Sequence, residues 1–156
     1  MNKYIQTDEL QKLIDWENIM RMKRYAGGHD DQMKGLIRNS KVIAHWNEGD
    51  WQGMVATCVQ LEDGRFAIYN DYYGSCSGCD SWEGANDAEV RILCINLANS
   101  AYIFNNLEDV KEFLSEEEFD NYSWNRCSKP LLKKIENFHM KKIIHSAPWY
   151  KESEEG

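Results

Sequence analysis

Residues 51–73 read WQGMVATCVQLEDGRFAIYNDYY, and this stretch decides the fold class. Its first half places apolar or β-branched residues at every second position, which predicts a β-strand. These positions are Val55, Thr57, Val59 and Leu61. The Asp63-Gly64 pair is typical of a tight hairpin turn, so residues 66–73 form the returning strand. Because another strand opens near Lys41 and ends in turn residues, the expected sheet is a three-stranded antiparallel β-meander.

Apolar residues at helical spacing flank this meander on both sides. Five helices are expected: one over residues 8–25, one over 30–37, one that begins near residue 87, one over 107–114, and one from Pro130 toward His145. Thr7, Asn86 and Asn106 are the candidate N-caps of three of them. Ser115-Glu116-Glu117-Glu118 has the spacing of a capping box for another helix. The fold class is therefore α+β, a three-stranded antiparallel β-meander packed with several helices.

The domain organisation follows from length and composition. A chain of 156 residues with no Pro-, Gly- or Ser-rich linker predicts a single α+β domain over residues 1–150, followed by a disordered tail at 151–156. The first residues lack the apolar segment of an export signal, and no window is apolar enough to span a membrane. We therefore expect a cytoplasmic protein with no membrane partner.

The charge of the chain bears on its partners. Eighteen basic and 26 acidic residues give a net charge of −8, which opposes approach to a phosphate backbone. Direct binding of nucleic acid is not expected. Local groups of basic residues, such as Arg21, Lys23 and Arg24, are interpreted as solvated helix faces. The sequence does not determine the oligomeric state.

The segment that follows the meander differs most from ordinary folding sequence. Residues 70–83 read NDYYGSCSGCDSWE and combine aromatic rings with carboxylates. Side chains of adjacent residues in a strand point to opposite faces, so at least one ring of Tyr72-Tyr73 is expected to face solvent unless helices cover both sides. Exposed aromatic residues rimmed by acidic ones are typical of a protein-binding surface. The candidate binding residues are Tyr72, Tyr73, Asp80, Trp82, Glu83 and Asp87.

Cys76 and Cys79 stand at the spacing of half a zinc site, and Gly78 between them tolerates a tight bend. No second Cys-x-x-Cys exists to supply the other two ligands. We therefore expect a protein without a cofactor and keep zinc as a candidate. Thiol redox chemistry is disfavoured, because Asp80 and Glu83 would raise the thiol pKa. The simplest interpretation is that small residues and thiols pack a tight turn. Five cysteines, an odd number, also fit reduced thiols better than disulfides.

No catalytic signature is evident in the sequence. There is no Gly-x-Ser-x-Gly elbow, the four histidines have no motif around them, and the loop at residues 74–78 lacks the Gly-Lys-Ser/Thr ending of a phosphate loop. Carboxylates near this loop lack the spacing of an EF-hand. We therefore assign no catalytic residue.

The run Tyr73-Gly74-Ser75-Cys76-Ser77-Gly78-Cys79-Asp80, followed by Trp82-Glu83, resembles a signature found in small uncharacterised proteins of bacteriophages and their bacterial hosts. The similarity spans residues 42–114 and implies a genomic setting without an activity. Small acidic proteins in that setting resemble the inhibitors that mobile elements use against host nucleases and other defence systems, anti-CRISPR proteins among them. The resemblance therefore implies a bacterial host protein as partner, with a nuclease or a defence complex as the favoured class.

The leading hypothesis is a non-enzymatic interaction protein of phage or mobile-element type that occludes a basic site on a bacterial protein. The alternative is a metal- or cysteine-dependent enzyme, or a small-ligand binder, centred on the Cys76/Cys79 loop. A small-molecule sponge is a third hypothesis. The leading hypothesis requires the rings and carboxylates around residues 69–87 to be accessible at the surface.

Overall fold

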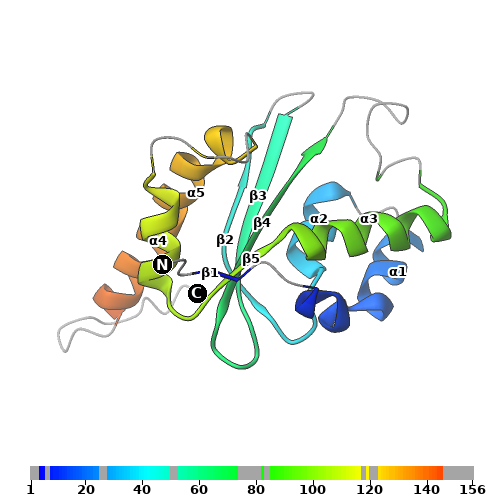
Figure 1. The fold of residues 1–156 in the computed structure, drawn as a ribbon, viewed down its shortest axis with the longest axis horizontal. Helices are drawn as coiled ribbons and strands as arrows, with labels where there is room; N and C mark the ends of the chain where they lie inside the picture. The colour runs from blue at the N-terminus through cyan, green and yellow to red at the C-terminus, as the bar shows by residue number, and fades with distance from the viewer. Residues whose placement is uncertain are drawn as a thin grey trace, which may run out of the picture.

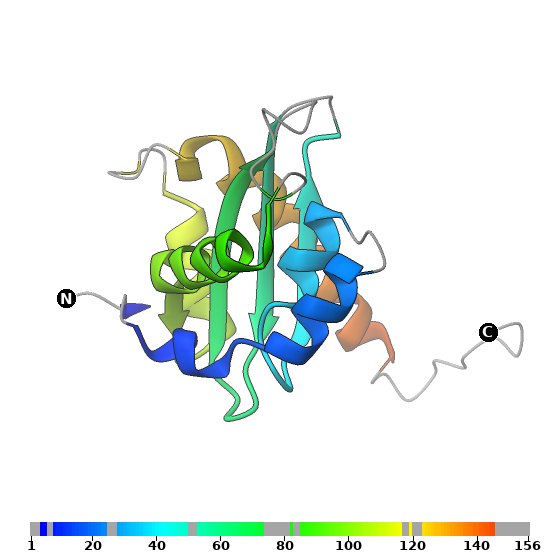
Figure 2. The ribbon, with the colours of Figure 1, turned by 90° about the vertical axis from the view of Figure 1, so that its right-hand side faces the viewer.

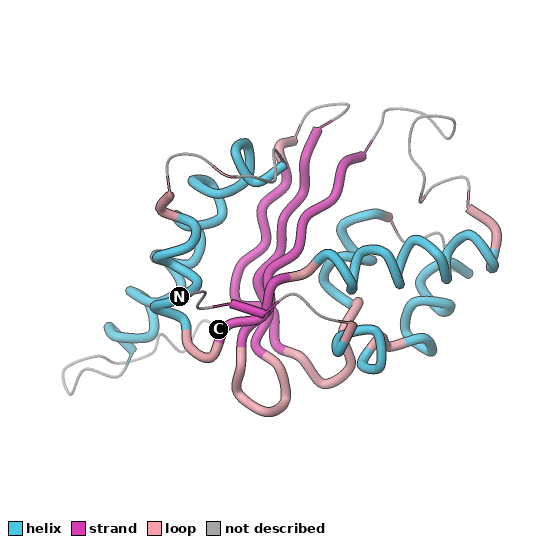
Figure 3. The backbone as a smooth tube through the Cα atoms, viewed as in Figure 1, coloured by secondary structure: helices cyan, strands magenta, loops and turns pink. Residues whose placement is uncertain are grey.

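The computed structural model describes residues 4–5, 8–24, 28–49, 53–73, 82, 85–116, 119 and 123–145. Within them an antiparallel sheet stands between two groups of helices (Figures 1 and 3). The elements, in chain order, are β1 (Tyr4–Ile5), η1 (Glu9–Leu13), α1 (Trp16–Arg24), α2 (His29–Gly35), β2 (Lys41–Asn47), β3 (Gly53–Gln60), β4 (Phe66–Tyr73), α3 (Asp87–Ser100), β5 (Tyr102–Phe104), α4 (Leu107–Leu114) and α5 (Ser123–His145). The α+β class expected from the sequence is confirmed.

The sheet has the strand order β1-β5-β4-β3-β2, and each neighbouring pair is antiparallel. The expected meander β2-β3-β4 is present, and its tight turn at Gly64 has the positive φ of +94° that favours glycine. The expectation of three strands was incomplete, because β5 pairs with Phe66–Ile68 of β4 and the two-residue β1 pairs with β5. Strands of two or three residues are too short to show the alternation of apolar and polar residues from which a strand is predicted.

Strand β3 is buried on both faces, and this places the core. Every residue from Gly53 to Val59 is buried, although the sequence alternates as a one-sided strand would. Val55 and Val59 belong to the hydrophobic cluster shared with η1, α1, α2 and α3, whereas Ala56 and Cys58 belong to the cluster shared with α4 and α5. The sheet is therefore the middle layer of three, and Figure 2 shows α3 and α1 lying across one face of the strands.

The N-terminal helical segment is broken, in contrast to the continuous helix expected over residues 8–25. The 3-10 helix η1 ends at Leu13, and Ile14 forms an isolated antiparallel bridge with Ile37. Helix α1 then restarts behind Asp15, whose carboxylate accepts a hydrogen bond from the backbone N–H of Asn18 at 3.1 Å. Pairing with residue 37 thus outweighs helix propensity at Ile14. The candidate cap Thr7 lies outside the described residues.

Two caps expected from the sequence are confirmed. Asn86 Oδ1 accepts from the backbone N–H of Glu89 at 2.9 Å at the start of α3, and Glu89 returns a bond to the N–H of Asn86 at 3.3 Å. Asn106 Oδ1 accepts from the N–H of Asp109 at 2.9 Å at the start of α4. Each bond satisfies a backbone donor that the first helical turn leaves open.

The second helical layer departs from expectation at two places. Ser115 caps the end of α4, where its hydroxyl donates to the carbonyl of Glu112 at 2.8 Å, and the expected capping box there was wrong at this residue. Helix α5 begins at Ser123, so Pro130 lies inside the helix and is not its first residue. Trp124 and Cys127, ahead of the proline, are both buried in the α4–α5 cluster. Their burial favours helix before Pro130 despite the donor that the proline lacks.

No helix among the described segments is both long and apolar enough to cross a membrane. The tail expected at residues 151–156 lies outside the described residues.

Tyr69 provides a test of the packing between the sheet and α2. Its buried hydroxyl donates to the carbonyl oxygen of Met33 at 2.5 Å. We expect Tyr69→Phe to lower the free energy of unfolding by about 1–2 kcal/mol, because the lost donor leaves a buried acceptor without that bond. Tyr72→Phe, which changes an exposed ring in the same strand, should change it by less than about 0.5 kcal/mol. Urea denaturation measures both, and equal effects would contradict the assignment.

Candidate functional site

Polar side chains gather where α2 covers the ends of β2, β3 and β4. Five of them form a connected hydrogen-bond network, which we call the α2–sheet cluster: Asp30, His45, Asn47, Thr57 and Tyr73. Strand register explains the gathering, because His45 stands opposite Thr57 and Asn47 stands opposite Val55 in the β2–β3 ladder. Alternation then points His45 and Asn47 to the same face.

His45 is the centre of the cluster. Its Nε2 lies 2.7 Å from Asp30 Oδ1, and its Nδ1 lies 2.8 Å from Thr57 Oγ. Burial lowers the pKa of His45, and the carboxylate of Asp30 offsets that only in part. The imidazole is therefore neutral at neutral pH. Because an ionised carboxylate only accepts hydrogen bonds, Nε2 carries the proton and Nδ1 accepts from the hydroxyl of Thr57.

Asp30 also receives two hydrogen bonds from the side-chain amide of Asn47, at 2.9 and 3.1 Å. Burial alone would raise the pKa of Asp30, but the bonds from Asn47 and His45 outweigh it and lower that pKa. The Oδ1 of Asn47 accepts from the hydroxyl of Tyr73 at 2.8 Å and from the N–H of Gly49 at 2.8 Å. The cluster thus joins α2 to β2 and β4 and continues into the turn after β2.

A second histidine–carboxylate pair lies beside the cluster. His29 Nε2 is 2.9 Å from Asp71 Oδ2, and the side chain of Asp71 keeps 39% of its surface exposed. Next along α2, buried Gln32 donates to the Sγ of Cys94 at 3.5 Å, while its side-chain oxygen has no hydrogen-bond partner among the described residues. Helix α2 therefore meets β4 and α3 through polar contacts.

The order Asp30–His45–Thr57 repeats the carboxylate–imidazole–hydroxyl order of a hydrolase triad. Here the hydroxyl is out of reach of a substrate, because Thr57 is fully buried in β3. The arrangement satisfies the only buried hydroxyl of the strand and fixes the position of α2. We assign it a structural role.

The described cysteines are also buried. Cys58, Cys94 and Cys127 are free thiols in the core, and burial raises the pKa of Cys58 and of Cys127 to about 12. Burial likewise raises the pKa of Cys94. Thiols with raised pKa values are weak nucleophiles. Cys76 and Cys79, the candidate metal ligands, lie outside the described residues, and within the described part of the chain no three His, Cys, Asp or Glu side chains converge on a metal position.

The structure separates the expected binding residues. Tyr72 is 46% exposed, and Asp87 is exposed at the start of α3. Tyr73 is half-buried within the α2–sheet cluster. Trp82 is only 2% exposed, so the expectation that its ring faces a partner was wrong. Asp80 and Glu83 lie outside the described residues.

Trp82 is buried because its ring joins the core under α1 and α3. Its carbonyl oxygen accepts from Lys23 Nζ at 2.8 Å, and the same ammonium lies 5.1 Å from the ring centroid. Burial of the large apolar surface of the indole stabilises the folded protein. Sequence reasoning also missed the α2–sheet cluster, although the matching alternation of His45-x-Asn47 and Thr57 on paired strands was a signal that could have found it.

The pH dependence of stability tests the state of His45. Because the pKa of His45 is lowered in the folded protein, the unfolded chain binds a proton at this residue near pH 6.5, whereas the folded protein binds it only at a lower pH. The free energy of unfolding should therefore fall as the pH drops through this range. Asp30, whose pKa is lowered from 3.8, keeps its contribution there. His45→Gln should flatten the slope, and an NMR titration midpoint of His45 above 6.5 would contradict it.

Comparisons with known proteins add no relative. The chain matches no protein-family model, no curated protein and no solved structure. The phage-type resemblance therefore stays a prediction from the sequence, and the functional argument rests on the chemistry of the residues themselves.

Proposed function

We propose that this protein is a non-enzymatic interaction protein of phage or mobile-element type, which occludes a basic site on a bacterial host protein. A nuclease or another component of a defence complex is the favoured partner class. The observation that carries the proposal is the exposed ring of Tyr72 at the end of the sheet where β4 finishes, with the partly exposed carboxylate of Asp71 next to it in the strand and on the opposite face.

Tyr72 has the features of a binding anchor. It is one of three large hydrophobic side chains exposed among the described residues, and the other two, Ile92 and Met140, lie on helices. It stands opposite Met54 in the β3–β4 ladder, on the face covered elsewhere by α4 and α5. Tyrosine on a rigid strand supplies contact area at a low entropic cost.

Partly exposed carboxylates on the α2 face, at the same end of the sheet as Tyr72, favour a basic partner. Asp71 precedes Tyr72 in β4 with 39% of its side chain exposed, and Asp30 at the start of α2 is 46% exposed. Both are held in place, Asp71 by His29 and Asp30 by His45. The acidic net charge of the whole chain would speed encounter with a basic surface.

The edge of β4 supports a mode of binding. Strand β5 pairs only with Phe66–Ile68, so residues 69–73 extend past it, and no other described strand pairs with them on that side. The N–H of Tyr72 is bonded to its neighbour Asp71 Oδ1 at 2.8 Å. A partner can add an extended basic segment along such an edge, with main-chain bonds for affinity and the Tyr72 ring for specificity.

The proposal redraws the surface expected from the sequence. Tyr72 keeps its role and Asp71 and Asp30 join it, whereas buried Trp82 is excluded. Tyr73 is half-buried, and the bond from its hydroxyl to Asn47 holds the end of β4 against β2.

Affinity capture with matched variants tests the proposal. We would immobilise the wild-type chain and the variants Tyr72→Ala and Met140→Ala and expose each to bacterial lysate. Mass spectrometry then identifies the retained proteins. We expect a basic protein retained by the wild type and by Met140→Ala, with retention at least about tenfold lower for Tyr72→Ala. Retention should also fall as salt rises.

Met140→Ala is the matched control because it removes another exposed apolar side chain, on α5. If every specifically retained protein binds Tyr72→Ala as well as the wild type, the proposed surface is wrong. Thermal unfolding of each variant confirms that the fold is intact, since both changes are at exposed positions.

A further inference from the structure

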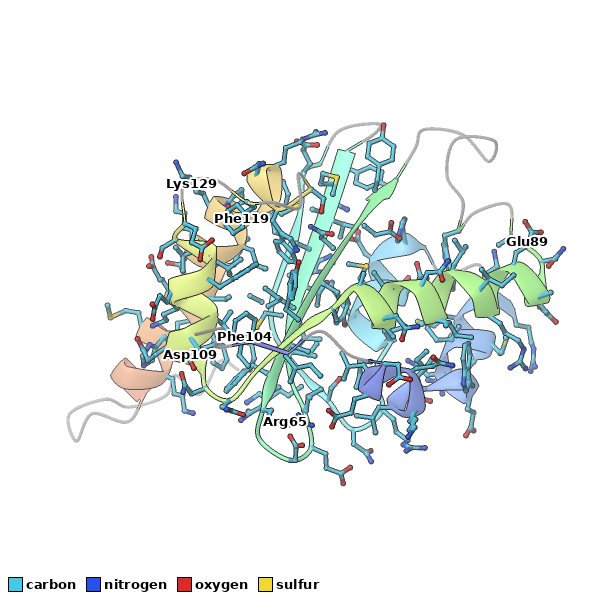
Figure 4. The ribbon with its side chains drawn as sticks, viewed as in Figure 1. Arg65, Glu89, Phe104, Asp109, Phe119 and Lys129 are labelled. Atoms are coloured by element: carbon cyan, nitrogen blue, oxygen red, sulfur yellow. The ribbon has the colours of Figure 1, made fainter. Side chains whose placement is uncertain are left out.

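A hollow of about 410 Å³ lies between the end of α1 and the start of α3, away from the Tyr72 surface. The described residues that line it are Met20, Lys23, Arg24, Asp87 and Arg91. Figure 4 marks this end of α3 with the labelled Glu89. The volume falls in the range of small-molecule sites in proteins.

Two of the three cations around the hollow are held in place by tryptophan rings. Lys23 Nζ lies 5.1 Å from the ring centroid of Trp82 and donates to its carbonyl oxygen. The guanidinium of Arg91 lies 5.3 Å from the ring centroid of Trp16. Cation–π contacts restrict long side chains, which lowers the entropic cost of binding a ligand.

The described residues at the hollow carry a charge opposite to that of the chain as a whole. Among them, three cations and one carboxylate line it, although acidic residues outnumber basic ones in the sequence. Neither Arg24 nor Arg91 forms an ion pair with a carboxylate among the described residues, even though Asp87 lines the same hollow. The guanidinium donors of both arginines can therefore bind an anion without first breaking an ion pair to a described carboxylate.

The position on α3 adds to this potential. Asp87 and Arg91 lie in the first two turns of a helix of 14 residues, whose N-terminus carries partial positive charge. Arg24 and Lys23 come from the last turn of α1 and face the hollow from the other helix. Cations on two separate elements can contact different oxygens of one ligand.

We propose that this hollow binds a small molecule carrying one or two phosphate groups. Arg24 and Arg91 bind phosphate oxygens through their guanidinium donors, and Lys23 supplies a third positive charge. Met20 gives the organic part of the ligand an apolar contact. Asp87 opposes the anion and sets a limit on affinity.

This site is independent of the proposed function. The Tyr72 ring lies on the sheet face shared with α4 and α5, whereas α1 and α3 cover the other face. Loss of partner binding in Tyr72→Ala therefore gives no information about the hollow, and variants of the hollow leave the Tyr72 surface intact.

Tryptophan fluorescence gives a direct measure of binding, because Trp16 and Trp82 each contact a cation of the site. The wild-type protein is titrated with pyrophosphate, and calorimetry measures the stoichiometry. We expect saturable binding of one pyrophosphate, and an affinity at least about tenfold lower in the Arg24→Gln/Arg91→Gln double variant.

The matched control is Arg38→Gln/Lys133→Gln, which removes the same charge from exposed residues before β2 and on α5, outside the hollow. Its affinity should stay within about twofold of the wild type, since distant exposed charges are screened. Asp87→Asn should raise the affinity several-fold, an effect that a purely structural role for Asp87 would not produce.

Three results would each overturn the proposal: no saturable binding of pyrophosphate, equal losses in the two double variants, or weaker binding in Asp87→Asn. Circular dichroism of each variant establishes that the fold is retained before affinities are compared. Titration with a short single-stranded DNA separates a small-molecule site from a nucleic-acid surface, and preference for DNA over pyrophosphate counts against the proposal.

Discussion

Burial of β3 on both faces is the constraint on which the rest of the structure depends. A strand enclosed between two helical layers must satisfy every polar group it carries, because none can reach water. In β3 the hydroxyl of Thr57 is such a group. Its partner is His45 on β2, and the partner of His45 is Asp30 on α2, so the bonds that satisfy this hydroxyl also tie α2 to the sheet.

The same constraint explains why residue types common in catalytic sites occur in the α2–sheet cluster without forming a catalytic site. The α2–sheet cluster has the residue types of an acid–base site, but its hydroxyl faces the core. Its neighbours at the rim are different. Asp71 and Asp30 each keep part of their carboxylate exposed while histidine holds the other part in place. Internal polar contacts thus orient side chains that remain available at the surface.

Local signals carried most of the fold that the sequence could predict. The alternation through residues 55–61, the Asp63-Gly64 turn and the caps Asn86 and Asn106 are each determined by neighbours in the chain, and each was confirmed. The misses depend on distant contacts. Ile14 leaves the helical path because it pairs with Ile37, and α5 starts before Pro130 because buried Trp124 and Cys127 stabilise its first turns.

The candidate site was less predictable for the same reason. Adjacent Tyr72 and Tyr73 point to opposite faces, so alternation predicts that one ring can be exposed, but it cannot identify which face the helices leave open at that end. For Trp82 the prediction was wrong. Its acidic neighbours in the sequence indicated a surface residue, but its ring is buried in the core. Both outcomes depend on which helix lies above, and that information is tertiary.

Net charge is a poor guide to the chemistry of any one site on this protein. At physiological ionic strength the screening length is about 8 Å, so a ligand senses the charges that line its site more than the total of the chain. The total of −8 describes the first approach of a partner, which favours a basic one at the Tyr72 surface. At the hollow between α1 and α3, the described lining has three cations, Lys23, Arg24 and Arg91, and one carboxylate, so its sum is positive. One acidic chain can therefore present partly exposed carboxylates beside α2 and an anion site between α1 and α3, because at each site the nearest charges decide the local sign.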